Sequence, residues 1–473
     1  MAFSSMSFLF GFLPLVILVT CLIPQKFHRA RNLSLLLFSL VFYAWGGLRL
    51  LPVLLASCLF TWAGGLLLGP EKRRRKLWLF LSLGVQLGLL GYFKYTGFFL
   101  EGLKALGAEL SVPAILLPAG LSFFCFQGMA YLVDVYRGHI PAEKNLGRLL
   151  LFQCFFPQLL QGPIVRYGDF APQLEDREES VHEAVEGGVR FCFGLAKKLL
   201  LADPLGQVAN AAFGAEGTLT VGLAWMGAIA YTLQLYLDFS GYTDMALGLG
   251  RSFGFHLPEN FDYPYCAKSA GEFWRRWHRT LSFWFRDYVY IPLGGNRVSR
   301  GRQIGNLLAV WLLTGLWHGA AWTFVAWGFY YFLLLSGEKF LWGRGLQKLP
   351  AALQHLYALL LVTLGWVLFR AESLPEAGRM LTAMLGLAPG GLWSGEASYL
   401  LKQFRWEWIV AIPTVLPVKN VLRSKLEAKA AVGDKGAKAL LFAGPKLLAL
   451  LLLGLCAIRL LSSSFRSFLY FQF

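Results

Sequence analysis

The chain has 473 residues, of which 56% are hydrophobic and only 15% are charged. Soluble domains carry about 25% charged residues, so this composition excludes a disordered chain, a coiled coil and a disulfide scaffold and predicts that lipid is the solvent. The formal net charge of +17 fits loops rich in Lys and Arg that face the cytoplasm, and no soluble basic face for nucleic acid is present.

Charge-free apolar runs predict the membrane spans, because about 20 apolar residues cross a bilayer. Clear runs are 1–25, 32–48, 50–70, 77–93, 110–133, 217–237, 303–337 and 349–369. Less certain runs lie near 149–165, 187–202, 408–418 and 439–458. We expect an all-α polytopic membrane protein with about 11 crossings, some of them short or re-entrant.

Basic loops predict the orientation in the membrane. Lys26, Arg29 and Arg31 follow the first run, a second basic cluster occupies 72–76, and a third lies in 419–438. Placing these loops in the cytoplasm puts both the N-terminus and the C-terminus outside. The first run lacks the basic start and small-residue cleavage site of a signal peptide, so we expect it to be retained.

His318 is the most informative single residue. Residues 303–337 contain no Asp, Glu, Lys or Arg, and His318 is the only imidazole among them. An ionisable group inside an apolar membrane segment is expensive, which favours a functional role. A neutral histidine that hydrogen-bonds across helices is the competing interpretation, and position alone leaves both open.

His278 lies in a segment rich in tryptophan and arginine, residues 271–286. On a continuous helix, one face would carry Trp274, His278, Leu281 and Phe285, and a second would carry Arg275, Arg279, Ser282 and Arg286. The first face predicts a buried histidine, which by itself favours a hydrogen-bonding role over catalysis. The arginine face favours headgroup contact over an anionic ligand.

The sequence predicts no metal site and no resident cofactor. The seven cysteines are scattered without a CxxC pair and are typical of small buried hydrophobes. The two histidines have no Cys or carboxylate partners at zinc-ligand spacing, and no GxSxG motif accompanies them. A histidine acting as general base on a hydroxyl from another molecule remains open.

Ordered motifs give a resemblance to a known family. They are GYFKY (91–95), FQ (126–127), YLVDVYRG (131–138), FPQLLQGPIVR (156–166), GLAKK (194–198), DFSGYTD (238–244), ENFDYPY (259–265), WRRWH (274–278), RDYVYIPLGGNR (286–297) and GLWHG (315–319). Together they resemble the membrane-bound O-acyltransferase (MBOAT) family, its bacterial alginate-acetylating members in particular. The motifs cover most of the chain from about residue 91 to residue 328.

The resemblance implies a ring of about 11–12 transmembrane helices around a thinned central tunnel, with re-entrant segments. It implies that His318 matches the family's invariant histidine and His278 its second histidine, so both are expected to be catalytic. Side chains expected to line or support the tunnel are Trp274, Trp277, Trp317, Asp238 and Asp244. The two aspartates and Arg275 are expected to support re-entrant backbone through ion pairs and helix caps. Arg275, Arg279 and Arg286 remain candidates for contact with the donor or with headgroups.

The C-terminal residues 468–473 resemble the aromatic tail of alginate-acetylating members and of a small partner protein in teichoic acid D-alanylation. This resemblance divides the chain into a catalytic domain, 1–460, and an outer-face tail, 461–473, in which Tyr470 is expected to carry the acetyl group transiently. An aromatic belt at the membrane interface is the alternative.

The expected function is a membrane O-acetyltransferase of the bacterial cytoplasmic membrane. Acetyl-CoA would be the donor substrate, an exported polysaccharide the final acceptor, and an extracytoplasmic protein with a serine hydrolase-like site the partner. Three alternatives stay open: D-alanyl transfer to teichoic acid from a carrier protein, acylation of a lipid or protein, and a transporter or flippase. Against transport, the sequence has no paired intramembrane carboxylates and no inverted repeat.

Overall fold

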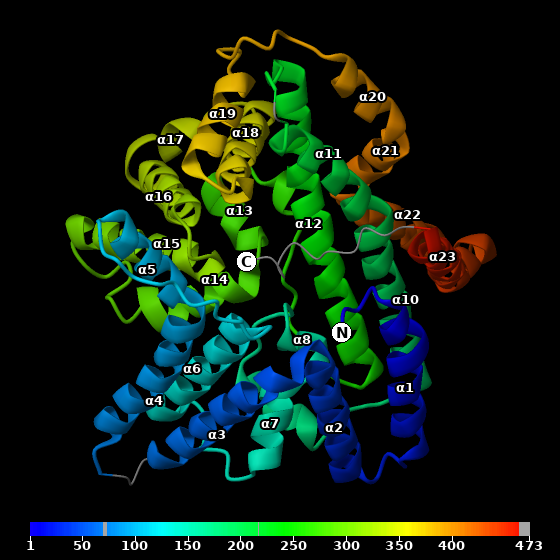
Figure 1. Ribbon diagram of the computed structural model, residues 1–473. Helices are drawn as coiled ribbons and strands as arrows, with labels where there is room; N and C mark the ends of the chain where they lie inside the picture. Colours follow the sequence, from blue (N-terminus) through cyan, green and yellow to red (C-terminus); the bar gives the residue numbers. More distant parts are fainter. Residues whose placement is uncertain (70–72, 216, 463–473) are drawn as a thin grey trace. The chain divides into compact units, whose positions relative to one another are not determined.

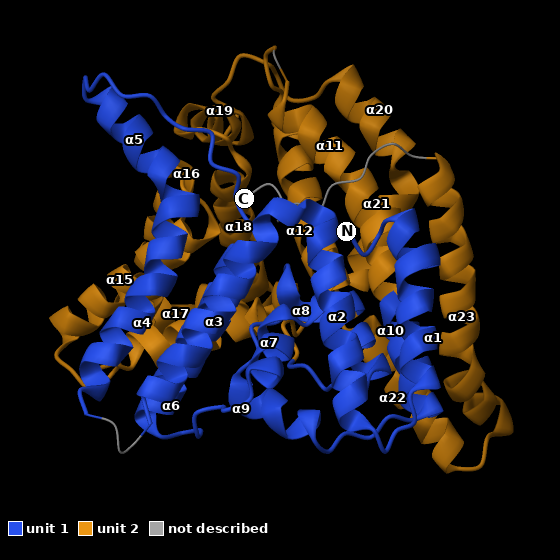
Figure 2. Cartoon of the chain, turned by 60° about the horizontal axis from the view of Figure 1, so that its bottom comes forward, with its two compact units in different colours: residues 1–191, 245–258 blue, residues 192–244, 259–473 orange. Residues whose placement is uncertain are grey.

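The computed structural model describes residues 1–69, 73–215 and 217–462, and within these ranges all regular elements are helical. Figure 1 shows the course of the chain from α1 to α23. The chain forms two compact units, 1–191 with 245–258 and 192–244 with 259–473, which Figure 2 shows in blue and orange. The predicted tail with Tyr470 lies outside the described residues, and the single domain 1–460 stays a prediction.

Unit 1 contains the N-terminal helices. They are η1 (Phe8–Phe12), α1 (Leu13–Leu22), α2 (His28–Gly47), η2 (Leu48–Leu50), α3 (Leu51–Leu67), α4 (Arg75–Leu90), η3 (Gly91–Tyr95), α5 (Thr96–Ala105), α6 (Leu121–Arg137), α7 (Leu146–Cys154), α8 (Phe156–Leu159), α9 (Tyr167–Phe170), η4 (Ala171–Leu174) and most of α10 (Val181–Ala196). The last turns of α12, from residue 245, also belong to this unit.

Unit 1 combines an aromatic core with polar bonds between helices. The rings of Phe8, Phe42 and Phe156 pack on one another with centroids 5.6 to 6.4 Å apart. On α4, the fully buried Gln86 accepts a hydrogen bond from Ser57 on α3, at 3.0 Å. Apolar side chains contact lipid tails as favourably as they contact protein, so burial of apolar surface does not drive helix association in a membrane. Hydrogen bonds between helices and close packing hold the helices together instead.

Unit 2 contains the longest helices. It comprises η5 (Lys197–Ala202), α11 (Asp203–Phe213), most of α12 (Val221–Ser252), η6 (Pro264–Cys266), α13 (Ala270–Arg276), α14 (Arg279–Phe285), η7 (Arg286–Tyr290), α15 (Arg300–His318), α16 (Trp322–Gly337), η8 (Glu338–Trp342), α17 (Gly343–Leu346), α18 (Ala351–Arg370), α19 (Leu374–Met384), α20 (Gly395–Gln403), α21 (Arg405–Thr414), α22 (Val418–Ala431) and α23 (Lys435–Ser462).

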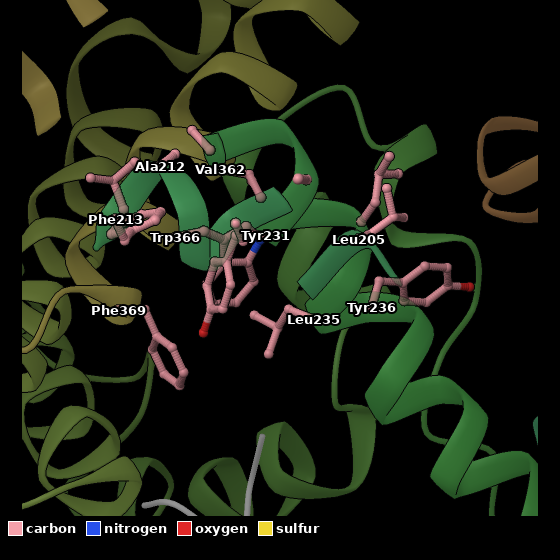
Figure 3. Close-up of a cluster of buried hydrophobic side chains, with 14 of the residues drawn as sticks. Leu205, Ala212, Phe213, Tyr231, Leu235, Tyr236, Val362, Trp366 and Phe369 are labelled. Carbon is pink, nitrogen blue, oxygen red and sulfur yellow. The ribbon is translucent and has the colours of Figure 1, made fainter. Parts of the chain in front are cut away.

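The core of unit 2 forms where α11, α12 and α18 meet. Figure 3 shows part of this cluster, including Tyr231 from α12 with Trp366 and Phe369 from α18. All three side chains are at most 1% exposed. Phe369 also contacts His318, so this core supports the wall of the candidate site described below.

Membrane-spanning character is clear from the helices themselves. Four helical segments in the described parts are long and apolar enough to cross a bilayer: 28–67, 75–105, 351–370 and 435–462. The predicted runs 32–48 and 50–70 join here into one segment of 40 residues, with a backbone break at Gly47. The all-α polytopic prediction is therefore confirmed, whereas the ring and the number of crossings stay predictions.

Three segments singled out in the sequence are not continuous helices. The run 110–133 is helical only from Leu121, since the preceding stretch, which includes Pro113 and Pro118, has no regular structure. The run 303–337 is broken between His318 and Trp322, and the segment 271–286 is broken at residues 277–278. Hydropathy reports burial in lipid and does not detect such breaks. The breaks in 303–337 and 271–286 lie directly at the two candidate histidines, His318 and His278.

Candidate active site

His318 is the last residue of α15, and aromatic rings surround its imidazole. It is 3% exposed. Its ring centroid lies 4.9 Å from that of Trp317, 5.1 Å from that of Trp327 and 5.1 Å from that of Phe369, all in edge-to-face geometry. Rings from α15, α16 and α18 thus fix the orientation of the imidazole in an apolar enclosure, where burial favours the neutral form of a histidine.

Glycines let the two helices on either side of the break at His318 pack closely against each other. A Cβ atom on Gly315 of α15 would lie 2.3 Å from the carbonyl oxygen of Phe324, and one on Gly328 of α16 would lie 2.4 Å from that of Trp311. The two helices therefore approach backbone to backbone, as small residues allow in membranes. Gly319 continues in extended conformation and packs on the ring of Phe324, leaving no room for a side chain.

His278 occupies the junction between α13 and α14, where the backbone leaves the helix. Its φ of 42° and ψ of 53° are left-handed, a conformation that costs a residue with a Cβ atom about 1–3 kcal/mol and persists only where the surroundings enforce it. The prediction of two continuous helical faces across 271–286 fails for this reason. Burial of His278, at 1% exposure, agrees with the inward placement expected for it.

The irregular segment before α13 is hydrogen-bonded to this junction. The N–H of Asp262 donates to the carbonyl of Arg276 at 2.9 Å, and the N–H of Arg279 donates to the carbonyl of Asn260 at 2.9 Å. The Nδ1 atom of His278 lies 3.0 Å from Oδ1 of Asn260. Its Nε2 atom is buried and has no hydrogen-bond partner among the residues that the structure describes.

Burial alone lowers the pKa of His278 to about 3, because an apolar surrounding disfavours the charged imidazolium. The ring of His278 contacts that of Phe239 of α12, with centroids 4.8 Å apart, and that of Trp317 of α15, at 5.8 Å. At physiological pH the imidazole is therefore neutral, with one protonated and one bare nitrogen.

Trp317 connects the two histidines. Its ring contacts His318 with centroids 4.9 Å apart and His278 with centroids 5.8 Å apart. The predicted support residues Trp274 and Trp277 are also buried, the former against Trp327 at 5.5 Å. Two buried imidazoles thus share one aromatic wall, an arrangement suited to proton transfer away from bulk water.

Asp238 and Asp244 of α12 lie in ion pairs with successive lysines. Lys198 is 2.9 Å from Asp238 and 2.6 Å from Asp203, and all three side chains are at most 6% exposed. Lys197 is 2.7 Å from Asp244. The π-helical turn η5 carries both lysines, and its wide turn lets consecutive residues reach the same helix. Sequence reasoning missed Lys198 and Asp203, although the GLAKK motif contains the lysine.

The three predicted donor-contact arginines remain on the outside of unit 2. Arg275 and Arg286 are exposed and Arg279 is half-buried. Arg286 pairs with its neighbour Asp287 at 2.6 Å, and both Arg279 and Arg286 lie over the ring of Phe283. Within the described ranges, no group of three or more His, Cys, Asp or Glu side chains is arranged to hold a metal ion.

Comparison with known proteins places these residues in a family. The model of the membrane-bound O-acyltransferase family matches residues 142–348. The chain is 45% identical to a probable alginate O-acetylase, AlgI, of Azotobacter vinelandii over 81% of this chain and 78% of the relative. It is 38% identical to the Pseudomonas putida protein of that name over 100% of both chains. A peptidoglycan O-acetyltransferase of Helicobacter pylori is 36% identical over 81% of this chain and 80% of the relative.

Proposed function

Because this chain belongs to the membrane-bound O-acyltransferase family, and is thus a bacterial membrane O-acyltransferase, we propose that it moves acetyl from acetyl-CoA for O-acetylation of an exported polysaccharide. The relatives reported above are named for the O-acetylation of two polymers, alginate and peptidoglycan. Both polymers contain sugar hydroxyls, and such a hydroxyl is the final acceptor in this proposal. The acceptor class therefore follows from the relatives, and the particular polymer does not.

The observation that carries the proposal is the pair of buried imidazoles in contact with the Trp317 ring. His318 acts as general base and removes the proton of an incoming hydroxyl as the oxygen attacks the thioester carbonyl. A new C–O bond forms, the C–S bond breaks, and the imidazolium returns its proton to the departing thiolate.

A membrane separates the donor from the acceptor, so the proposal includes a relay. Acetyl-CoA is confined to the cytoplasm, and the basic loops 26–31 and 419–438 favour a cytoplasmic side opposite to both termini. Tyr470 in the tail would take the acetyl group as a phenyl ester and pass it to an extracytoplasmic partner with a serine hydrolase-like site. A phenol has a pKa of about 10, so its ester is more reactive than the sugar ester that finally forms.

Turnover of labelled acetyl-CoA by the purified protein tests the role of His318. His318→Ala should lower the rate roughly 10²–10⁴-fold, the contribution of a positioned general base, while the protein stays folded. His139→Ala is the matched control, because this histidine is 62% exposed in its side chain and lies far along the chain in unit 1. Wild-type turnover by His318→Ala would refute the assignment, and release of no acetyl by the wild type would favour the transporter alternative.

A further inference from the structure

Asn260 lies next to His278 and is fully buried, with 0% exposure. Its carbonyl oxygen Oδ1 receives three contacts: the N–H of Thr280 at 3.3 Å, the hydroxyl of Thr280 at 2.9 Å, and Nδ1 of His278 at 3.0 Å. The backbone of Asn260 accepts from the N–H of Arg279 as well. Both the main chain and the side chain of this asparagine therefore bind the junction that carries the histidine.

These contacts determine which imidazole nitrogen carries the proton. A backbone N–H only donates, so the side-chain atom of Asn260 that faces Thr280 is its oxygen and not its amide nitrogen. An amide oxygen only accepts, and the Nδ1 atom of His278 at 3.0 Å must then be the protonated nitrogen. In a neutral imidazole the other nitrogen, Nε2, carries a lone pair and accepts hydrogen bonds.

The left-handed backbone at His278 belongs to the same arrangement. Reversal of the chain at φ 42° lets the imidazole of His278 and the N–H of Thr280 point to one oxygen. Such a conformation persists at sites where the surroundings enforce it. The opposite ring nitrogen, Nε2, is buried and has no partner within the part of the chain that the structure describes.

We propose that Asn260 is a positioning residue of the acyl-transfer site, which holds His278 in the Nδ1–H form so that Nε2 accepts a hydrogen bond from an N–H group of the bound donor. The pantetheine arm of an acyl-CoA carries an amide N–H two carbons from the thioester sulfur, which suits this role. A lone pair repels a carbonyl oxygen, so His278 does not polarise the thioester carbonyl. The identity of the donor rests on the function proposed above, whereas the tautomer does not.

Asn260→Asp is the sharpest perturbation, because it replaces an amide by a carboxylate of nearly the same shape. The carboxylate still accepts from Thr280 and from Nδ1, but its charge stabilises the imidazolium and raises the pKa of His278. Protonated Nε2 can no longer accept, so the KM for acetyl-CoA should rise about ten-fold, the loss of about one hydrogen bond. The activity of Asn260→Asp should also fall as the pH is lowered from about 8 to about 5, whereas that of the wild type should not.

Asn210→Asp is the matched control, since Asn210 is exposed and its Oδ1 accepts from Arg370 at 3.0 Å. It should leave both the KM and the pH profile unchanged. A raised KM with an unchanged pH profile in Asn260→Asp would indicate a merely structural role and overturn the proposal. So would a wild-type KM.

The tautomer can be measured without any activity. Solid-state nitrogen-15 spectra of the histidine-labelled full chain in lipid separate bare from protonated imidazole nitrogens, and His278→Gln identifies the signals of His278. We expect a bare Nε2 and a protonated Nδ1 across neutral pH. A protonated Nε2 would overturn the inference even if acetyl transfer is found, whereas a bare Nε2 in a protein without transferase activity would refute only the proposed function.

Discussion

The close approach of α15 and α16 makes Gly315→Ala a direct test of how the helix break positions His318. A Cβ atom at residue 315 would lie 2.3 Å from the Phe324 carbonyl oxygen, whereas ordinary contact begins near 3.4 Å. The difference, 3.4 − 2.3 = 1.1 Å, must be absorbed by separating the two helices, because the clashing atom is backbone. Overpacking of this kind costs about 1–3 kcal/mol, and a displacement of about 1 Å near the chemistry lowers rates about 10²-fold.

The assay is acetyl-CoA turnover together with thermal unfolding of the purified variant. Gly305→Ala is the matched control, since it lies in the same helix with no atom within 4 Å of its added methyl group. It should keep wild-type turnover and gain up to about 1 kcal/mol from helix propensity. If Gly315→Ala matches Gly305→Ala in both measurements, the backbone contact between α15 and α16 does not position His318 for the proposed reaction.

Three further predictions concern charge and the tail. Lys198→Met removes the ion pairs of this lysine with the buried Asp203 and Asp238 and should lower the free energy of unfolding by about 3–5 kcal/mol. Lys425→Met, at an exposed position of α22, should not change the melting temperature, and equal melting of the two variants would contradict the reasoning. Tyr470→Phe should abolish acetylation of the polymer, and undiminished polymer acetylation in this variant would exclude the relay. Intact-mass analysis of the wild type, given acetyl-CoA without acceptor, should show one acetyl group on Tyr470. Arg275→Ala should raise the KM for acetyl-CoA if the exposed arginine contacts the donor, and an unchanged KM would assign it to headgroup contact.

The charge network also separates two kinds of defect. Loss of the proposed general base His318 should lower turnover and leave unfolding unchanged, whereas loss of Lys198 should lower stability because Asp203 and Asp238 each lose an ion pair with this lysine. Replacing Lys198, Asp203 and Asp238 together by apolar residues of similar size should recover much of the lost stability. Measuring turnover and unfolding on the same samples therefore distinguishes a defect at the proposed base, His318, from a defect in the ion pairs between η5, α11 and α12.

Much of the protein could be predicted from its sequence. Composition and apolar runs alone indicate an all-helical membrane protein, because roughly 20 apolar residues in a row have few other stable uses. The absence of charge over 303–337 isolates His318 as the one imidazole of that run. The motifs around His278 and His318 indicate the family, which the comparisons confirm.

Tertiary structure decided what those residues can do. Hydropathy does not reveal that α15 ends at His318, nor that α15 and α16 then approach backbone to backbone at Gly315 and Gly328, since those contacts join atoms of two helices. Nor does helical periodicity reveal the left-handed turn at His278, because Asn260, eighteen residues earlier, enforces it through hydrogen bonds. The apolar content of a segment can be read from neighbouring residues in the chain. A histidine tautomer, a buried ion pair and a contact between two helices depend on residues that only folding brings together.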